Sequence, residues 1–383
     1  MKTLSYTLCA VLAGGFAFTG DAQVKPKSKK VTELKFSGRI QGQYDAIETD
    51  KKSADNRNHF YFRRLFLGGH AKAGDNWGGD VVMDFAASPN TDKSVFIDGA
   101  SVWYKHSDAL RVDLGQKKVP FGVEETTSSS KLKAIERSAV NRQFAEALKF
   151  NARHTGLFAK GVIADGWNYD LAAVNSGQNH NSKDADLKSA KFYDYERNEL
   201  SFFGRLAYNN YDSDLRYGYG IAAGNQKLST TSASSSETNA SEITAYNVFG
   251  NLGFGSINLE AEYMSGVVDT VDEGDHDHKG YSLQASYALS NAPAGSWEFL
   301  YRYSQVESSK DRYVHAGEIV RRANIHSDTQ KADEIEQHYI GVNYLFNGHD
   351  AKLMVGYELN DIIQDGVTVD EANGFRARVQ FLF

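Results

Sequence analysis

Cysteine and proline are scarce in this 383-residue chain, which has one Cys and four Pro. Cys9 lies in an apolar run at the N-terminus, so the chain beyond that run has no thiol for a disulfide or for nucleophilic catalysis. Few prolines beside 34 Gly and 12% aromatic residues are typical of a chain built from many strands.

Long apolar runs and an excess of positive charge are also missing. Beyond the N-terminus no stretch holds 18 consecutive apolar residues, so membrane-spanning helices are not expected. The formal net charge of −7 argues against nucleic acid as a partner.

The N-terminus has the organisation of a secretory signal. Lys2 precedes an apolar run from Leu4 to Phe18, and the small residue Ala22 follows. We predict a signal peptide over residues 1–22, cleaved near Ala22–Gln23, and a short periplasmic leader over residues 23–34. A buried N-terminal helix is the alternative interpretation.

From residue 35 to residue 383 the dominant pattern alternates apolar and polar residues. In KFSGRIQGQY, Phe36, Ile40 and Tyr44 share one face, while Arg39 and Gln41 lie on the other. Sixteen such segments begin near Lys35, His59, Gly78, Ser94, Leu110, Arg153, Trp167, Glu199, Leu215, Thr244, Ser256, Gly280, Trp297, Ile335, Ala351 and Asn373.

The connections between segments are alternately short and long. Tight turns such as ADGW and FGS alternate with long polar connections, among them Lys118–Ala152, Glu307–Glu334 and Asn360–Ala372. An even strand number with this alternation predicts a transmembrane antiparallel β-barrel of about 16 strands in a bacterial outer membrane, with both termini at the short-turn end. A soluble β-sandwich or propeller is the alternative, but its core would not bury the Arg, Glu and Gln of the polar faces.

The C-terminal stretch NGFRARVQFLF reads as the closing strand of such a barrel. Phe375, Val379 and Phe381 alternate with Arg376 and Arg378. Pairing of this strand with the first would remove the open edge of the sheet, and its apolar side chains would face lipid.

Basic residues recur on the polar faces and are candidates for a positively charged lumen. A lipid-facing Arg at mid-membrane would cost roughly 2–4 kcal/mol, which favours inward placement. Arginine in a pore attracts anions and matches phosphate or carboxylate in two-point contacts. Alternatively, these side chains only pair with Asp113, Glu260, Glu262, Glu298 and Glu358. The candidates are Arg39, Arg63 or Arg64, Arg111, Lys160, Arg205, Arg216, Arg302, Arg376 and Arg378.

The longest connection, Lys118–Ala152, contains apolar positions of its own, such as Ile135 and Phe144. Such positions favour a loop that folds into the barrel and narrows the channel. Lys131 and Lys133 would then set the local field, beside the hydroxyl groups of residues 128–130. The alternative is a solvated loop that points outward.

Four segments, FSGRIQGQYD, FYFRRLFLGG, GQKKVPFGVEETTSS and IERSAV, resemble the phosphate-selective porin O and P family. The resemblance implies a sixteen-stranded, usually trimeric porin with an arginine ladder and a basic constriction. It places Arg39, Arg63, Arg64 and Lys131 among the anion-binding positions and matches Asp98 to an acidic residue of that site. It also implies that the insertion machinery reads the C-terminal Phe383.

Strand alternation puts two conditions on these matches. Arg63 and Arg64 are neighbours, so both can point inward only if a β-bulge intervenes. Asp98 shares a face with Phe96 and Val102, so it too requires a bulge to reach the lumen.

These patterns together predict a passive porin for small anions such as phosphate or polyphosphate, and not an enzyme. No Gly-x-Ser-x-Gly elbow occurs, and the His residues are scattered. A general or carboxylate-selective pore and an adhesin remain as alternatives. His276 and His278 could bind a metal or could lie in a solvated loop, but no metal or cofactor is expected.

Overall fold

The computed structural model describes residues 31–50, 57–86, 95–175, 199–211, 214–227, 240–270, 274–289, 295–321, 323 and 325–383. The expected signal peptide and residues 23–30 of the expected leader lie outside these ranges. The first strand begins at Glu33, two residues before the predicted start at Lys35.

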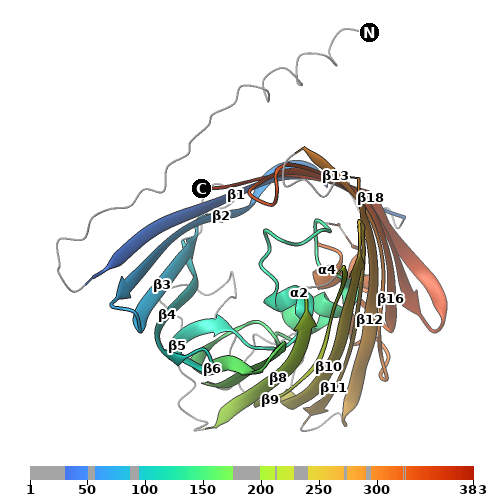
Figure 1. The fold of residues 1–383 in the computed structure, drawn as a ribbon. Helices are drawn as coiled ribbons and strands as arrows, with labels where there is room; N and C mark the ends of the chain where they lie inside the picture. The colour runs from blue at the N-terminus through green and yellow to red at the C-terminus, as the bar shows by residue number, and fades with distance from the viewer. Residues whose placement is uncertain are drawn as a thin grey trace.

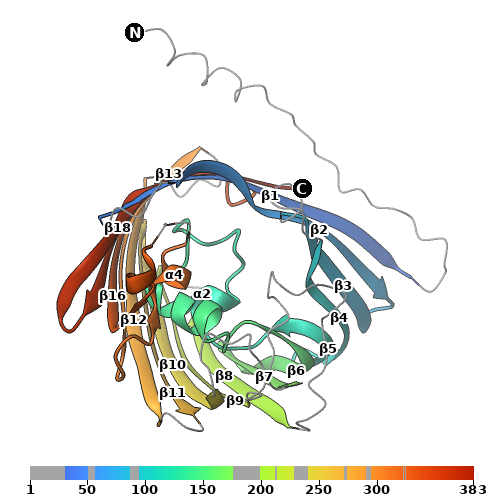
Figure 2. The same ribbon diagram turned by 180° about the vertical axis from the view of Figure 1, so that it is seen from behind.

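Within the described residues, sixteen antiparallel strands close into one barrel, which confirms the predicted architecture (Figures 1 and 2). Each strand pairs with its neighbours in the sequence, β13 pairs with β16, and β1 pairs with β18. The strands are β1 (Glu33–Thr49), β2 (Arg57–Ala73), β3 (Trp77–Asp84), β4 (Phe96–Ser107), β5 (Leu110–Lys118), β6 (Arg153–Ala164), β7 (Trp167–Asn175), β8 (Leu200–Asn210), β9 (Leu215–Lys227), β10 (Ala240–Phe254), β11 (Ile257–Thr270), β12 (His276–Ala288), β13 (Ser296–Ser308), β16 (Glu334–Asn347), β17 (Ala351–Gln364) and β18 (Val367–Leu382).

The seam between β1 and β18 uses the chain to its last residue. Ile40 lies opposite Phe381 in the register, and Gly38 exchanges backbone hydrogen bonds of 2.6 and 3.1 Å with Phe383. Phe381 and Phe383 are 41% and 57% exposed, so they lie on the outer face. The prediction that NGFRARVQFLF closes the barrel is therefore confirmed.

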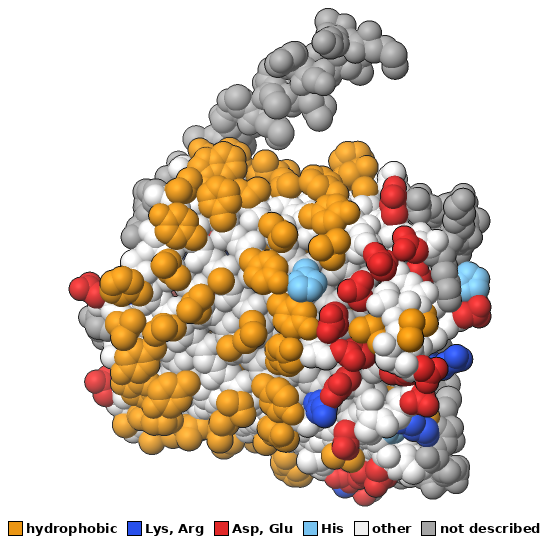
Figure 3. Space-filling model, turned by 90° about the vertical axis from the view of Figure 1, so that its right-hand side faces the viewer, with side chains coloured by type: hydrophobic (Ala, Val, Ile, Leu, Met, Phe, Trp, Pro, Cys, Tyr) orange, Lys and Arg blue, Asp and Glu red, His pale blue; other side chains and the backbone are white. Residues whose placement is uncertain are grey.

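The outer face is apolar over most of its height. Figure 3 shows hydrophobic side chains spread across the wall and carboxylates gathered toward one end. At the long-loop ends of the strands, Asp361 lies opposite both Glu336 and Glu371. None of the helices in the described part of the chain has the length and apolarity needed to cross a membrane.

The third loop, residues 119–152, folds into the barrel as predicted (Figure 1). It contains three short helical turns: α2 (Val123–Thr126), α3 (Ala139–Arg142) and the π-helical turn η1 (Gln143–Ala147). The Ser138 hydroxyl accepts a hydrogen bond from the backbone N–H of Asn141, which caps α3. Phe121, Phe144 and Phe150 are fully buried against the inner wall, so the loop is a packed element.

A second inward element is the seventh loop, described over residues 309–321, 323 and 325–333. It contains the short hairpin β14 (Val314–His315) and β15 (Lys331–Ala332), α4 (Ala316–Ile319) and the 3-10 turn η2 (Ser327–Thr329). Ile319 and Val320 join the buried cluster that contains Val140 and Phe144 of the third loop. Sequence analysis identified this stretch only as a long connection, although its apolar residues signalled burial.

The expected loop Asn360–Ala372 is wrong. β17 and β18 continue through most of it and are joined by the two residues Asp365 and Gly366. Both have positive φ, 51° and 72°, as a tight hairpin turn requires. The Asp-Gly pair, which follows Ile362-Ile363-Gln364 and precedes Val367, was the signal for this turn.

Candidate functional site

Two neighbouring arginines both enter the lumen through a β-bulge. The register of β1 against β2 shifts between Gln41 and Gly42, which lie opposite Arg64 and Phe62, so Arg63 is the extra residue. The Arg63 Nε lies 2.8 Å from Glu136 Oε1, and Arg64 Nη1 donates to Gln41 Oε1 at 2.9 Å. Strand alternation allows both arginines to point inward only if a β-bulge intervenes, and this bulge is present.

A second bulge turns Asp98 inward. The register of β3 against β4 shifts between Val82 and Met83, which lie opposite Gly99 and Ile97 and leave Asp98 as the extra residue. Its carboxylate accepts a hydrogen bond of 2.7 Å from Arg153 Nη2. Asp98 is therefore inside the barrel, and its carboxylate is paired with the Arg153 guanidinium.

Several arginines converge on Glu136 of the third loop. Its carboxylate accepts hydrogen bonds of 2.8 Å from both Arg63 Nε and Arg378 Nη2, and Arg142 Nη1 lies 3.8 Å from it. Glu136 is 5% exposed, and the neighbouring guanidinium groups hold its pKa well below the ordinary value against the opposing effect of burial. These contacts join β2, β18 and the third loop.

Two further predicted lumen arginines are also buried in ion pairs. Arg376 lies between Asp45 and Glu358, at 2.8 Å from each carboxylate. Arg302 donates to Glu124 Oε1 at 2.9 Å. Arg302 and Arg376 are 1% and 0% exposed, so they do not face open water. Arg302 sits between the wall and the third loop, whereas Arg376 Nη2 donates to the Arg321 carbonyl of the seventh loop at 2.9 Å.

The segment of the third loop from Ser128 to Lys133 lies along the wall near the short-turn end. Arg39 Nη1 and Nη2 donate to the hydroxyl groups of Ser129 and Ser128 at 2.5 and 3.1 Å. The Lys131 side chain is exposed. Lys133 is occupied instead, because its Nζ donates to Ser286 at 2.7 Å and lies 3.2 Å from Glu260.

Three more basic residues lie on β5, β6 and β8. Arg111 pairs with Asp113 at 2.7 Å and stacks over Trp103 at 4.3 Å. Lys160 lies opposite Arg111 in the register and is exposed. Arg205 donates to the Thr126 hydroxyl at 3.1 Å, so it bridges from β8 to α2.

The histidines of the DHDHKG stretch do not lie in a solvated loop. His276 and His278 belong to β12 and are 1% and 0% exposed, with their rings 5.2 Å apart. Among the residues that the structure describes, no group of three or more His, Cys, Asp or Glu is placed to hold a metal ion.

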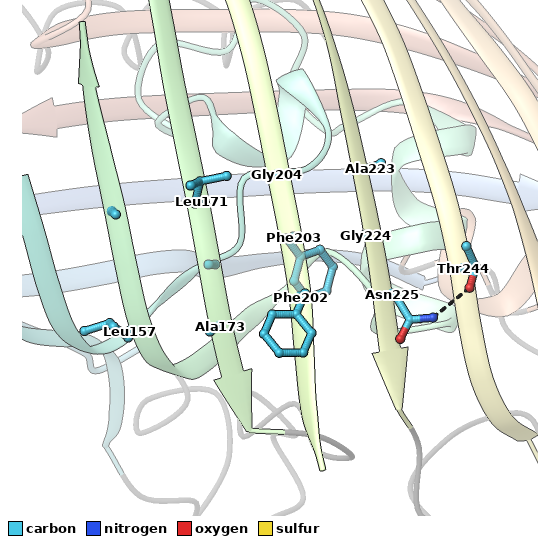
Figure 4. Close-up of a pocket in the computed structure, with 12 residues that line it drawn as sticks. Leu157, Leu171, Ala173, Phe202, Phe203, Gly204, Ala223, Gly224, Asn225 and Thr244 are labelled. Carbon is cyan, nitrogen blue, oxygen red and sulfur yellow. Dashed lines mark hydrogen bonds between the residues drawn. The ribbon is translucent and has the colours of Figure 1, made fainter. Parts of the chain in front are cut away.

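A groove of about 660 Å³ opens on the outside of the wall, across β6–β10 (Figure 4). Its lining includes Leu157, Leu171 and Phe202, which are between 49% and 56% exposed. These side chains belong to the apolar outer face, so the groove is separate from the channel.

A closed sixteen-stranded barrel with an apolar exterior, a charged interior and a packed inward loop defines the class of outer-membrane porins. The model of the family described as phosphate-selective porin O and P matches residues 34–383, and the chain belongs to this family. Its place is therefore the outer membrane of a Gram-negative bacterium.

Known proteins agree with this assignment. Porin O of Pseudomonas aeruginosa is 24% identical over 442 residues, covering 100% of this chain and 98% of that protein. An anion-selective porin from Comamonas acidovorans has a TM-score of 0.62 at 13% identity, over 92% of this chain and 99% of that one. The outer-membrane channel DcaP of Acinetobacter baumannii has a TM-score of 0.61 at 14% identity, over 94% and 100%. The two structural likenesses show the fold.

The structure adds three features that sequence reasoning missed. Glu136 as a common partner of several arginines was not predicted, although IERSAV was singled out by resemblance. Glu124, which accepts from Arg302 and from the backbone N–H of Ser138 at 2.8 Å, was also missed. The inward seventh loop is the third feature, and Arg142 Nε joins it to the third loop by donating to the Glu318 carbonyl at 3.1 Å.

Proposed function

We propose that this porin is a passive diffusion channel for small anions, with phosphate or polyphosphate as the favoured species. One observation carries the proposal: Arg39, the Ser128 and Ser129 hydroxyl groups and the exposed Lys131 occupy one short stretch of the lumen. Cationic groups beside hydroxyl donors can replace part of an anion's hydration shell and still bind weakly enough to release it.

The other basic candidates have graded roles in this proposal. Arg64, Arg111, Arg205 and Lys160 would line the path, and Asp98 would orient Arg153 at 2.7 Å. Four other basic residues pair with carboxylates or lie close to them: Lys133, Arg302, Arg376 and Arg378. They would contribute to the electrostatic field in the lumen without direct contact with the ion.

The proposal extends to export and assembly. The chain would be exported by its N-terminal signal and inserted through recognition of the strand that ends at Phe383. It would assemble as a homotrimer, since the family resemblance implies trimers and the similar OmpT of Vibrio cholerae is described in a trimer form.

Reversal potentials in a planar bilayer under a KCl gradient test the anion preference. We expect chloride to be preferred over potassium, added phosphate to reduce the chloride current, and Lys131→Gln to lower both effects by about twofold or more. Lys279→Gln is the matched control. Lys279 lies on β12, its side chain is 55% exposed, and it pairs with Glu307 of β13. Potassium preference that Arg39→Gln and Lys131→Gln leave unchanged would contradict the proposal.

A general pore is the second candidate, and one observation favours it. Carboxylates neutralise many of the inward arginines, as the Arg376 contacts with Asp45 and Glu358 illustrate. A general pore would pass chloride and potassium equally and would not respond to phosphate in the same bilayer experiment. An adhesin would give no discrete conductance steps.

A further inference from the structure

Glu136 occupies an unusual electrostatic position. Arg63 from β2, Arg378 from β18 and Arg142 from the third loop all lie within 3.8 Å of its carboxylate. Gln43 Nε2 also donates to Oε1, at 3.3 Å. The Glu136 carboxylate is therefore close to three guanidinium groups that come from three separate parts of the chain.

The backbone of the same residue adds a further arginine. The Glu136 carbonyl accepts from Arg302 Nη1 at 2.9 Å. On either side of it, Ile135 N–H donates to the Tyr339 hydroxyl at 3.3 Å and Ser138 N–H donates to Glu124 at 2.8 Å. Glu136 thus lies in a part of the third loop that is hydrogen-bonded to the wall through Arg302 and Tyr339.

One of the arginines around Glu136 has an unsatisfied hydrogen-bond donor. Among the described residues, the Arg378 Nη1 atom is buried and has no hydrogen-bond partner. The Arg63, Arg378 and Glu136 charges are buried, and buried charges are screened by salt much less than exposed ones. A change of charge at residue 136 therefore reaches the lumen as a change in the field.

We propose that Glu136 is a specificity-determining residue: its carboxylate masks Arg63 and Arg378 from the permeating ion and so limits the anion preference of the channel. This inference rests on the proposed function only in that the chain conducts ions. It assigns Glu136 a role opposite to that of the basic residues around it.

The mask is present at all physiological pH values. The carboxylate keeps its charge because the surrounding arginines hold its pKa well below the ordinary value of 4.5. The charge of Glu136 therefore stays constant over this pH range, and so does its effect on the electrostatic field in the lumen.

Bilayer recordings of three variants test the inference. Glu136→Gln keeps the shape and removes the charge, and we expect it to raise the chloride-to-potassium permeability ratio by about twofold or more. Glu136→Asp keeps the charge and should stay close to the wild-type ratio. Arg378→Gln removes one masked cation and should lower the ratio.

The matched control is Glu242→Gln. It removes one carboxylate from the half-buried pair with Lys227 at the long-loop end of β10, where the hydrogen-bond donors to Glu242 are Asn225 and Lys227 of β9. This variant changes the total charge of the chain by the same amount and should leave the permeability ratio unchanged. An equal effect of both glutamine variants would overturn the inference, because the cause would then be total charge.

Two results separate this inference from the proposed function. If the wild type prefers potassium and Glu136→Gln still moves the ratio toward chloride, the anion assignment fails and the mask stands. If the wild type prefers chloride while Glu136→Gln and Arg378→Gln both keep its ratio, the mask is refuted. Heat-modifiable mobility on gels verifies that each variant is folded, and Arg378→Gln carries the test if Glu136→Gln does not fold.

Discussion

At the scale of single residues, Arg376 shows what buried charge demands inside this barrel. Its guanidinium lies 2.8 Å from both Asp45 and Glu358, and all three side chains are at most 1% exposed. Such a group contributes little net stability when complete, but the loss of one member leaves uncompensated buried charges. The arginine is therefore required by its partners as much as by any ion in the channel.

We predict that Arg376→Met lowers the free energy of unfolding by about 3–5 kcal/mol. Denaturant unfolding in detergent micelles measures the loss. Adding Asp45→Asn and Glu358→Gln to the same chain should recover most of it, because no unpaired charge then remains. Lys279→Met, which breaks a solvent-exposed pair, should cost less than about 1 kcal/mol. Equal losses for the two methionine variants would contradict the prediction.

At the scale of elements, the third loop is held by packing as well as by charge. Tyr339 is fully buried in a cluster with Ala134 and Ile135 of the loop. The Tyr339 ring lies across two glycines of β16 and β17, and a Cβ atom on Gly356 would come 2.2 Å from its hydroxyl oxygen. Glycine is needed there because the ring occupies the space of a side chain.

We predict that Gly356→Val displaces Tyr339, loosens the third loop and raises single-channel conductance. The free energy of unfolding should fall by about 1–3 kcal/mol, as is typical of overpacking. Gly69→Val is the control, because nothing lies within 4 Å of a Cβ placed on Gly69. Conductance recordings and denaturant unfolding are carried out on both variants. Equal changes for Gly356→Val and Gly69→Val would refute the prediction.

Much of this element structure could be predicted from sequence because strand alternation is strict. The start of β1 was off by two residues, and the inward third loop followed from apolar positions such as Phe144. The rest depends on where neighbours meet in space. Alternation alone forbids both Arg63 and Asp98 from pointing inward, and only the observed register shifts allow it. The role of Glu136 likewise requires contacts between distant segments.

At the scale of the whole molecule, the inward loop ties stability to pH. Nearby arginines hold the pKa values of Glu125, Glu136 and Glu146 below the ordinary 4.5 despite burial. A lowered carboxyl pKa stabilises the fold above 4.5, and this stabilisation is lost as pH falls toward the folded-state value. Burial, followed by Lys352, lowers the pKa of His349 on a short turn to about 4 from 6.5, so its contribution is lost from pH 6.5 downward.

We predict that the unfolding midpoint falls in two stages as the pH is lowered below about 6.5. His349→Gln should remove most of the first stage, between about pH 6.5 and 4, because no imidazole is left to bind a proton. Glu136→Gln should flatten the second stage, below about pH 4.5. Denaturant titrations across this pH range measure both effects, and an unfolding midpoint that rises on acidification would contradict the prediction.

The seam at Gly38 and Phe383 has a practical consequence for anyone who handles this porin. Phe383 pairs through its backbone with Gly38 of β1. An affinity tag fused directly after Phe383 would therefore begin at the point where β1 and β18 close the barrel. The two-residue hairpin at Asp365 and Gly366 is the better place to graft a peptide, since it ends both strands without touching the seam.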